Sequence, residues 1–249
     1  MGCTPKMSFE SILVKHIAFP LSDIVRGIHS VKCFHELEKT QWLSPTQLEE
    51  LQQKKLHALL AHAYENVPYY RKTFKENKLK PNDIKSIDDL TKLPFLTKEI
   101  IRINFPDNIT SNNYNKNQLI KFYSGGTTNE PLFSYKDKNT ISYGLGAAYR
   151  GWSWGGYRLG DRYAMLWRSP DTIKEYSKFS MRVKNIMRRN LFLPSFDMSK
   201  ETLFKHIKDL RKYKPKIIRA SPSAAYTCLL YTSDAADEGL GVDLGGRRI

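Results

Sequence analysis

A short run of glycine and hydroxyl residues is the part of this sequence best suited to chemistry. Residues 123–131 read YSGGTTNEP, and five consecutive positions are Ser124, Gly125, Gly126, Thr127 and Thr128. Adjacent glycines let backbone N–H groups turn toward one point, and the hydroxyls add neutral donors. The run therefore predicts a loop that binds a phosphate chain. A polar hairpin turn is the alternative, because Gly-Gly and Ser/Thr clusters also mark turns.

Conventional catalytic patterns are missing from the sequence. No Gly-Lys-Ser/Thr follows the glycine pair, which excludes a Walker A loop, and no Gly-x-Ser-x-Gly elbow occurs. The six histidines form no pair with metal-ligand spacing beside an acidic partner. We therefore assign no metal ligand and leave the catalytic side chains unassigned. The cysteines, Cys3, Cys33 and Cys228, also lack metal-type spacing, and their odd number fits a reduced, cytoplasmic setting.

The elements around the loop indicate an α/β region. Strands are expected at 118–122 and 132–136, a helix at 139–151, and a buried strand at 162–167. Further on, a strand at 191–196, a helix at 200–213 capped by Ser199 and a strand at 216–219 follow one another. The length of this unit is that of a βαβ crossover, so we predict a mainly parallel sheet.

The first hundred residues instead predict helices. Residues 8–36 are expected to be helical with a break at Pro20, and Ser44-Pro-Thr-Gln47 has the form of a helix start with a capping box. Shorter helices are expected at 69–77, at 87–92 and from a Thr97 cap to about residue 104. Residues 106–117 are rich in Asn and Ser and are interpreted as a linker.

The formal charge of +15 raises the possibility of an acidic partner. Lysine and arginine are spread along most of the chain, so nucleic acid is not the expected partner. The densest basic stretch, 182–189, predicts a helix with Val183, Ile186 and Met187 on one face. A solvated basic face is the first interpretation of that helix, and an acidic membrane surface or a polyanionic glycan is the alternative. No apolar run of about 18 residues occurs, so no transmembrane helix is expected.

Four stretches make the chain resemble the phenylacetate–CoA ligase-like family of adenylate-forming enzymes, and most closely its capsule-biosynthesis (CapK-like) branch. They are 59–71 (LLAHAYENVPYYR), 87–99 (IDDLTKLPFLTKE), the glycine loop, and FDMS at 196–199 with KYKPKIIR at 212–219. Their order and approximate spacing match the family from about residue 35 to 228. The loop departs from the commonest family form, since Asn129 replaces a glycine and Glu130 replaces a frequent lysine.

The resemblance implies ATP-dependent adenylation of a small-molecule carboxylate, with Mg²⁺ as a further cofactor. The acyl group would then pass to coenzyme A or, in the capsule or surface-polysaccharide branch, to another acceptor. It further implies that residues 124–128 hold the β- and γ-phosphates of ATP. A third hypothesis, from another class, is a basic non-catalytic module that binds nucleic acid or another polyanion.

The resemblance also implies how the chain is divided. We expect a helical N-terminal region at 1–110, a partial α/β AMP-binding-type domain at 111–228 and a non-native tail at 229–249. The tail is expected to lack a buried apolar face. Because the family's aromatic-Gly-x-Thr-Glu segment, ribose-binding aspartate and catalytic lysine have no counterpart here, the chain is expected to be an N-terminal fragment that is inactive alone.

Overall fold

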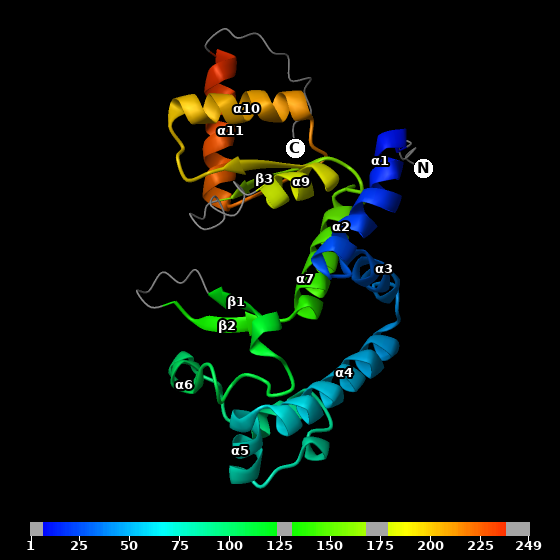
Figure 1. Cartoon of the computed structure of the whole chain (residues 1–249), viewed down its shortest axis with the longest axis vertical. Helices are drawn as coiled ribbons and strands as arrows, with labels where there is room; N and C mark the ends of the chain where they lie inside the picture. The colour runs from blue at the N-terminus through cyan, green and yellow to red at the C-terminus, as the bar shows by residue number, and fades with distance from the viewer. Residues whose placement is uncertain (1–6, 124–130, 168–178, 238–249) are drawn as a thin grey trace. The chain divides into compact units, whose positions relative to one another are not determined.

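The chain forms two compact units in a computed structural model (Figure 1), which describes residues 7–123, 131–167 and 179–237. One unit joins residues 1–31 to 147–249, and the other consists of residues 32–146. The domain boundaries predicted at residues 110 and 228 remain predictions. Within the described residues, no helix combines the length and the apolar character needed to cross a bilayer.

The unit of residues 32–146 is mainly helical. Its elements are most of α3 (Ser30–Thr40), α4 (Pro45–Asn66), α5 (Pro68–Glu76), the 3₁₀ turns η2 (Pro81–Asp83), η3 (Asp88–Lys92) and η4 (Lys116–Gln118), α6 (Lys98–Asn104), the strands β1 (Ile120–Tyr123) and β2 (Phe133–Lys136), and the start of α7 (Lys138–Trp154). The helices predicted before residue 105 are therefore present. The stretch at 87–92 is a 3₁₀ turn rather than an α-helix.

Capping and apolar burial explain the α4–α5 pair. The Ser44 hydroxyl accepts a hydrogen bond from the Gln47 N–H, and the Gln47 side chain accepts one from the Ser44 N–H, which confirms the predicted capping box. Leu60, Phe74 and Ile84 form the buried core beneath these helices. The predicted linker at 106–117 lies within this unit and is bonded to it, because the Asn112 N–H donates to a carbonyl of α4.

The N-terminal helices differ from the prediction in where they break. A π-helical turn, η1 (Val14–Ala18), connects α1 (Phe9–Leu13) to α2 (Phe19–Arg26), so the helix continues through Pro20. Proline is tolerated there because it lies in the first turn of α2, where a missing N–H costs little. The chain breaks instead at Gly27, whose φ of 61° is left-handed and ends α2.

Three parallel strands form the sheet of the other unit. β4 (Asn190–Pro194) and β5 (Ile217–Ala220) both pair in parallel with β3 (Tyr163–Trp167), which gives the order β4-β3-β5. The helix α10 (Lys200–Tyr213), capped by Ser199 as predicted, therefore connects two strands that are separated by β3. The expected α/β fold class, a helical N-terminal region followed by a mainly parallel sheet, is confirmed.

One apolar cluster holds the helices on this sheet. Leu166 of β3, Leu193 of β4, Leu203 of α10 and Cys228 of α11 (Pro222–Asp237) are all buried together. The first part of the predicted tail, up to Asp237, is therefore helical because α11 extends through it. The rest of the tail, residues 238–249, lies outside the described residues, and the tail prediction stays open.

A buried ion pair connects the N-terminal helices to the sheet. Arg188, between α9 (Phe179–Met187) and β4, is 3% exposed and pairs with Asp23 of α2. Its guanidinium also donates to the Ser22 hydroxyl at 2.9 Å and to the Tyr149 hydroxyl at 2.6 Å. Asp23 accepts a further bond from the Ser30 hydroxyl at 2.9 Å.

The interpretation of 182–189 as a solvated basic face is therefore wrong at Arg188. The apolar residues of this helix are also not packed into a core, because Ile186 is 76% and Val183 39% exposed. Arg189 adopts a left-handed φ of 50° at the end of α9, and this reversal directs its side chain to Ser11 and Glu10 of α1. Two arginines of the basic stretch, Arg188 and Arg189, therefore make contacts within the protein.

We expect Arg188→Met to lower the free energy of unfolding by about 3–5 kcal/mol, because it leaves the Asp23 carboxylate buried without its cation. The measurement is urea denaturation followed by circular dichroism. Arg182→Met, at an exposed position on the same helix, is the matched control and should change stability by no more than about 0.5 kcal/mol. Equal effects of the two substitutions would contradict a stabilising role for the pair.

We also expect Gly160→Ala to be destabilising by more than about 1 kcal/mol. Gly160 has a φ of 97°, and a Cβ there would lie 2.2 Å from the Ser11 carbonyl oxygen. Gly151→Ala, inside α7 with open space around it, should instead stabilise the helix by about 0.5–1 kcal/mol. The two melting temperatures, measured side by side, should move in opposite directions.

Candidate functional site

The predicted phosphate-binding loop is framed by an antiparallel pair of strands. β1 and β2 pair with Ile120 opposite Lys136 and Tyr123 opposite Phe133. Both predicted flanking strands are thus confirmed, with β1 shifted by one to two residues. The five site residues themselves, Ser124, Gly125, Gly126, Thr127 and Thr128, lie outside the described residues, so the phosphate prediction for this loop stays open.

Lysine side chains lie over aromatic rings on both faces of this hairpin. On one face, the Lys121 ammonium lies 4.3 Å from the centre of the Phe133 ring. On the other face, the Lys136 ammonium lies 3.6 Å from the centre of the Phe122 ring. Because strand side chains alternate between faces, cross-strand pairs of this kind fix the register of the two strands. The two strands that flank the loop are therefore held in a fixed register.

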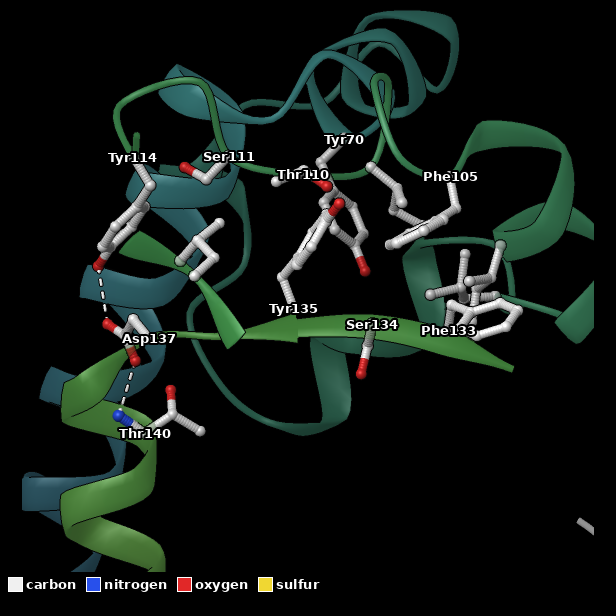
Figure 2. Close-up of a pocket in the computed structure, with 14 residues that line it drawn as sticks. Tyr70, Phe105, Thr110, Ser111, Tyr114, Phe133, Ser134, Tyr135, Asp137 and Thr140 are labelled. Carbon is white, nitrogen blue, oxygen red and sulfur yellow. Dashed lines mark hydrogen bonds between the residues drawn. The ribbon is translucent and has the colours of Figure 1, made fainter. Parts of the chain in front are cut away.

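A pocket of about 370 Å³ lies on the Tyr135 side of β2 (Figure 2). Aromatic side chains dominate its wall, with Tyr70 from α5, Phe105 after α6, and Phe133 and Tyr135 from β2. The Phe105 ring packs on Tyr135, with 5.1 Å between ring centres. In Figure 2 the Tyr135 side chain points toward Tyr70 from the strand.

Asp137, which caps α7, is the one charged side chain among the described residues of this lining. Its carboxylate accepts a bond from the Thr140 N–H at 2.7 Å and one from the Tyr114 hydroxyl at 3.1 Å. Burial alone would raise the pKa of Asp137, but these hydrogen bonds outweigh it and hold the pKa below its usual value. The bond to the carboxylate in turn raises the pKa of Tyr114. The carboxylate is therefore ionised and the phenol neutral at pH 7.

Ser111, also in the lining, is bonded to a histidine but is not arranged as a nucleophile. The Ser111 hydroxyl lies 3.1 Å from Nε2 of His62 and donates to the Asn113 side-chain oxygen at 2.6 Å. The amide nitrogen of Asn66 lies 3.4 Å from Nδ1 of His62, which favours the tautomer with the proton on Nε2. In that tautomer the histidine donates to the serine and cannot remove its proton.

This lining suits a neutral or cationic group better than an anion. Its described residues offer hydroxyls, aromatic faces and one ionised carboxylate, and none of them is a lysine or arginine. A phosphate chain beside these residues would meet the negative charge of Asp137. The described lining therefore favours a neutral or cationic group over a phosphate chain. In the part of the chain that the structure describes, no group of three or more His, Cys, Asp or Glu residues could hold a metal ion.

Most of the other motif residues have structural contacts. In the 59–71 stretch, Arg71 donates to the Tyr64 and Glu65 carbonyls, so it satisfies the last turn of α4. In FDMS, Asp197 accepts bonds from the Ser199 N–H and the Thr202 hydroxyl, and these bonds lower its pKa at the start of α10. Both motifs therefore position helix ends.

Three arginines of the α/β region, Arg162, Arg168 and Arg219, could pair with an anion, but those that are described have internal contacts. Arg162 pairs with Glu10 and donates to the Tyr213 carbonyl, and Arg219 lies over the Trp167 ring at 4.8 Å. Arg168 lies outside the described residues. Sequence analysis missed the pocket residues Tyr135 and Asp137, although an Asp three residues before Thr140 is a helix-start signal that could have marked the second.

Comparison of sequences finds relatives of one kind. The chain is 30% identical over 198 residues to a phenylacetate–coenzyme A ligase of Aromatoleum evansii, covering 78% of this chain and 42% of that protein. It is 27% identical over 204 residues to the Pseudomonas putida enzyme of the same name, covering 81% and 43%, and 34% identical over 107 residues to that of Escherichia coli K12, covering 43% and 24%. No family model matches.

Comparison of structures agrees on the fold. A crystal structure of 2-hydroxyisobutyryl-CoA ligase, in complex with 2-HIB-AMP and CoA in the thioesterification state, matches with a TM-score of 0.57 at 18% identity and covers 79% of this chain and 41% of that one. An open conformation of the same ligase gives 0.54 at 16% identity, with 79% and 44% covered. The chain spans about two fifths of the length of the relatives it matches most extensively. It is thus similar in sequence to phenylacetate–coenzyme A ligases and shares the fold of a CoA ligase over the matched part.

Proposed function

We propose that this chain belongs to an ATP-dependent acid–thiol ligase. The enzyme would adenylate a small carboxylate and transfer the acyl group to coenzyme A. The observation that carries the proposal is the similarity to phenylacetate–coenzyme A ligases over 198 residues. The fold shared with 2-hydroxyisobutyryl-CoA ligase is consistent with it. The parallel sheet and the hairpin that frames residues 124–128 are the elements that the proposal uses.

In this proposal residues 124–128 hold the β- and γ-phosphates of ATP. Glycine backbone N–H groups and the hydroxyls of Ser124, Thr127 and Thr128 supply donors that stabilise charge as pyrophosphate leaves. ATP supplies the electrophilic α-phosphorus, and Mg²⁺ would reduce the charge of the phosphate chain. The nucleophile is the carboxylate of the substrate, which is already ionised at pH 7 and needs no catalytic base. The protein contributes mainly by holding these groups in position.

The narrower assignment to the capsule-biosynthesis branch is also a proposal, and it concerns the acceptor. It rests on the sequence motifs at 59–71, 87–99 and 196–219. An enzyme of that branch would form the adenylate in the same way but would transfer the acyl group to a different acceptor. A reduced compartment such as the cytoplasm, where free thiols persist, is the proposed setting for either acceptor.

The proposal predicts that adenylation depends on the loop hydroxyls. The test protein is a chimera in which this chain is continued by the corresponding remainder of the Aromatoleum ligase. The double variant Thr127→Val/Thr128→Val keeps side-chain volume but removes two donors, so it should lower kcat/KM for carboxylate-dependent ATP–pyrophosphate exchange about 100-fold or more. A panel of aryl and aliphatic carboxylates, with coenzyme A added in a second step, identifies the substrate and the acceptor.

Thr46→Val is the matched control for this experiment. Thr46 is an exposed hydroxyl residue of α4 that lies outside the loop and is not among the pocket-lining residues. Its removal should leave exchange within about twofold of the unmodified chimera. Undiminished exchange in the double variant would contradict the role of the loop. A chimera that folds but shows no exchange with any carboxylate would contradict the ligase proposal itself.

A further inference from the structure

A second cavity, of about 410 Å³, lies between α2 and α9. Its apolar wall consists of Val25 from α2 and Met181, Val183 and Met187 from α9. Val25 is 78% exposed and Val183 39% exposed, so the cavity is open to solvent. Methionine side chains are flexible and adapt to ligands of different shape. The volume is within the range of roughly 300–1,000 Å³ that small-molecule sites occupy.

The charges in this cavity have one sign. Arg26 at the end of α2 and Lys184 of α9 both line it, and none of the described lining residues is an aspartate or glutamate. The nearby carboxylate, Asp23, is already committed to Arg188 and to the Ser30 hydroxyl. Positive charge therefore exceeds negative charge around the cavity.

Arg26 is a half-buried cation of this lining. The carboxylate that attracts it, Asp23, is already bonded to Arg188 and to the Ser30 hydroxyl. Burial, followed by repulsion from Arg188, lowers the pKa of Arg26 below its usual value. A half-buried guanidinium has lost part of its hydration, so an anion that reaches it gains more than it would at a fully exposed arginine.

We propose that this cavity binds a single-chain anionic amphiphile, with the anionic head at Arg26 and the hydrocarbon chain along Met181, Val183 and Met187. A carboxylate is the simplest head group, because a guanidinium can bind its two oxygens with parallel hydrogen bonds. The apolar wall excludes a purely polyanionic ligand, which would leave the methionines in contact with water. The lining residues of the site are different from residues 124–128, and the proposal does not depend on the proposed ligase activity.

The test uses the unmodified chain, without ATP, in isothermal titration calorimetry. Octanoate is the probe, octylammonium reverses the charge, and acetate removes the hydrocarbon chain. We expect measurable binding of octanoate alone. Arg26→Gln should weaken octanoate binding about tenfold or more, because it removes a charged hydrogen-bond donor. Arg182→Gln, which changes an exposed arginine of α9 outside the lining, should leave it within about twofold.

A second variant distinguishes a loss of binding from a loss of the folded structure. Val25→Glu places a carboxylate in the lining at an exposed position, so it should keep the melting temperature but repel octanoate. Arg26→Gln is itself expected to keep or raise the melting temperature, since it removes a half-buried charge that is repelled by Arg188. Equal binding of octanoate and octylammonium, or octanoate binding that both variants leave unchanged, would overturn the proposal. Binding to phosphatidylglycerol vesicles without binding to dissolved octanoate would also overturn it, in favour of an anionic membrane surface.

Discussion

The unit that contains the parallel sheet depends on the buried pair between Asp23 and Arg188. These residues are 165 positions apart in the sequence, and their contact brings α2 against the junction of α9 and β4. Tyr149 of α7 and Ser30 at the start of α3 complete the hydrogen bonding, and the Phe19 ring lies 5.2 Å from the Arg188 guanidinium. A charge pair with so little exposure tolerates few other arrangements of its neighbours, because each unmet hydrogen bond would leave a buried polar atom unsatisfied.

The fold was largely predictable from local sequence signals. The Ser44 capping box, the Ser199 cap of α10 and the alternation of strand, helix and strand between β4 and β5 each depend on neighbouring residues, and the structure confirms them. Long-range features were not predictable in the same way. The position of β3 between β4 and β5 depends on pairing with two other strands. The burial of Arg188 depends on partners such as Ser22, which is more than a hundred residues away in the sequence. A pattern within a window of some 15 residues carries no information about such partners.

The candidate site was predictable to a smaller extent. The strands on either side of residues 124–128 could be recognised because Gly and Thr clusters interrupt extended runs. The aromatic pocket could not, since Tyr70, Phe105 and Tyr135 are ordinary apolar positions in their own segments and meet only through packing. The same holds for Arg26, which has the sequence features of a helix-ending arginine. Its place in a cavity wall, half-buried near Arg188, arises from the three-dimensional arrangement of α2 and α9.

The interrupted course of the chain through its two units has a consequence for synthesis on the ribosome. Residues 32–146 are continuous and can fold as soon as they emerge, whereas residues 1–31 belong to a unit that is completed only by residues after 147. Until Arg188 has been translated, Asp23 lacks the guanidinium that pairs with it. Tyr149, which packs on the Phe19 ring, is also translated after the intervening unit. The first helices therefore keep apolar surface exposed while the intervening unit forms. Nascent chains of this protein should engage chaperones mainly through their N-terminal segment.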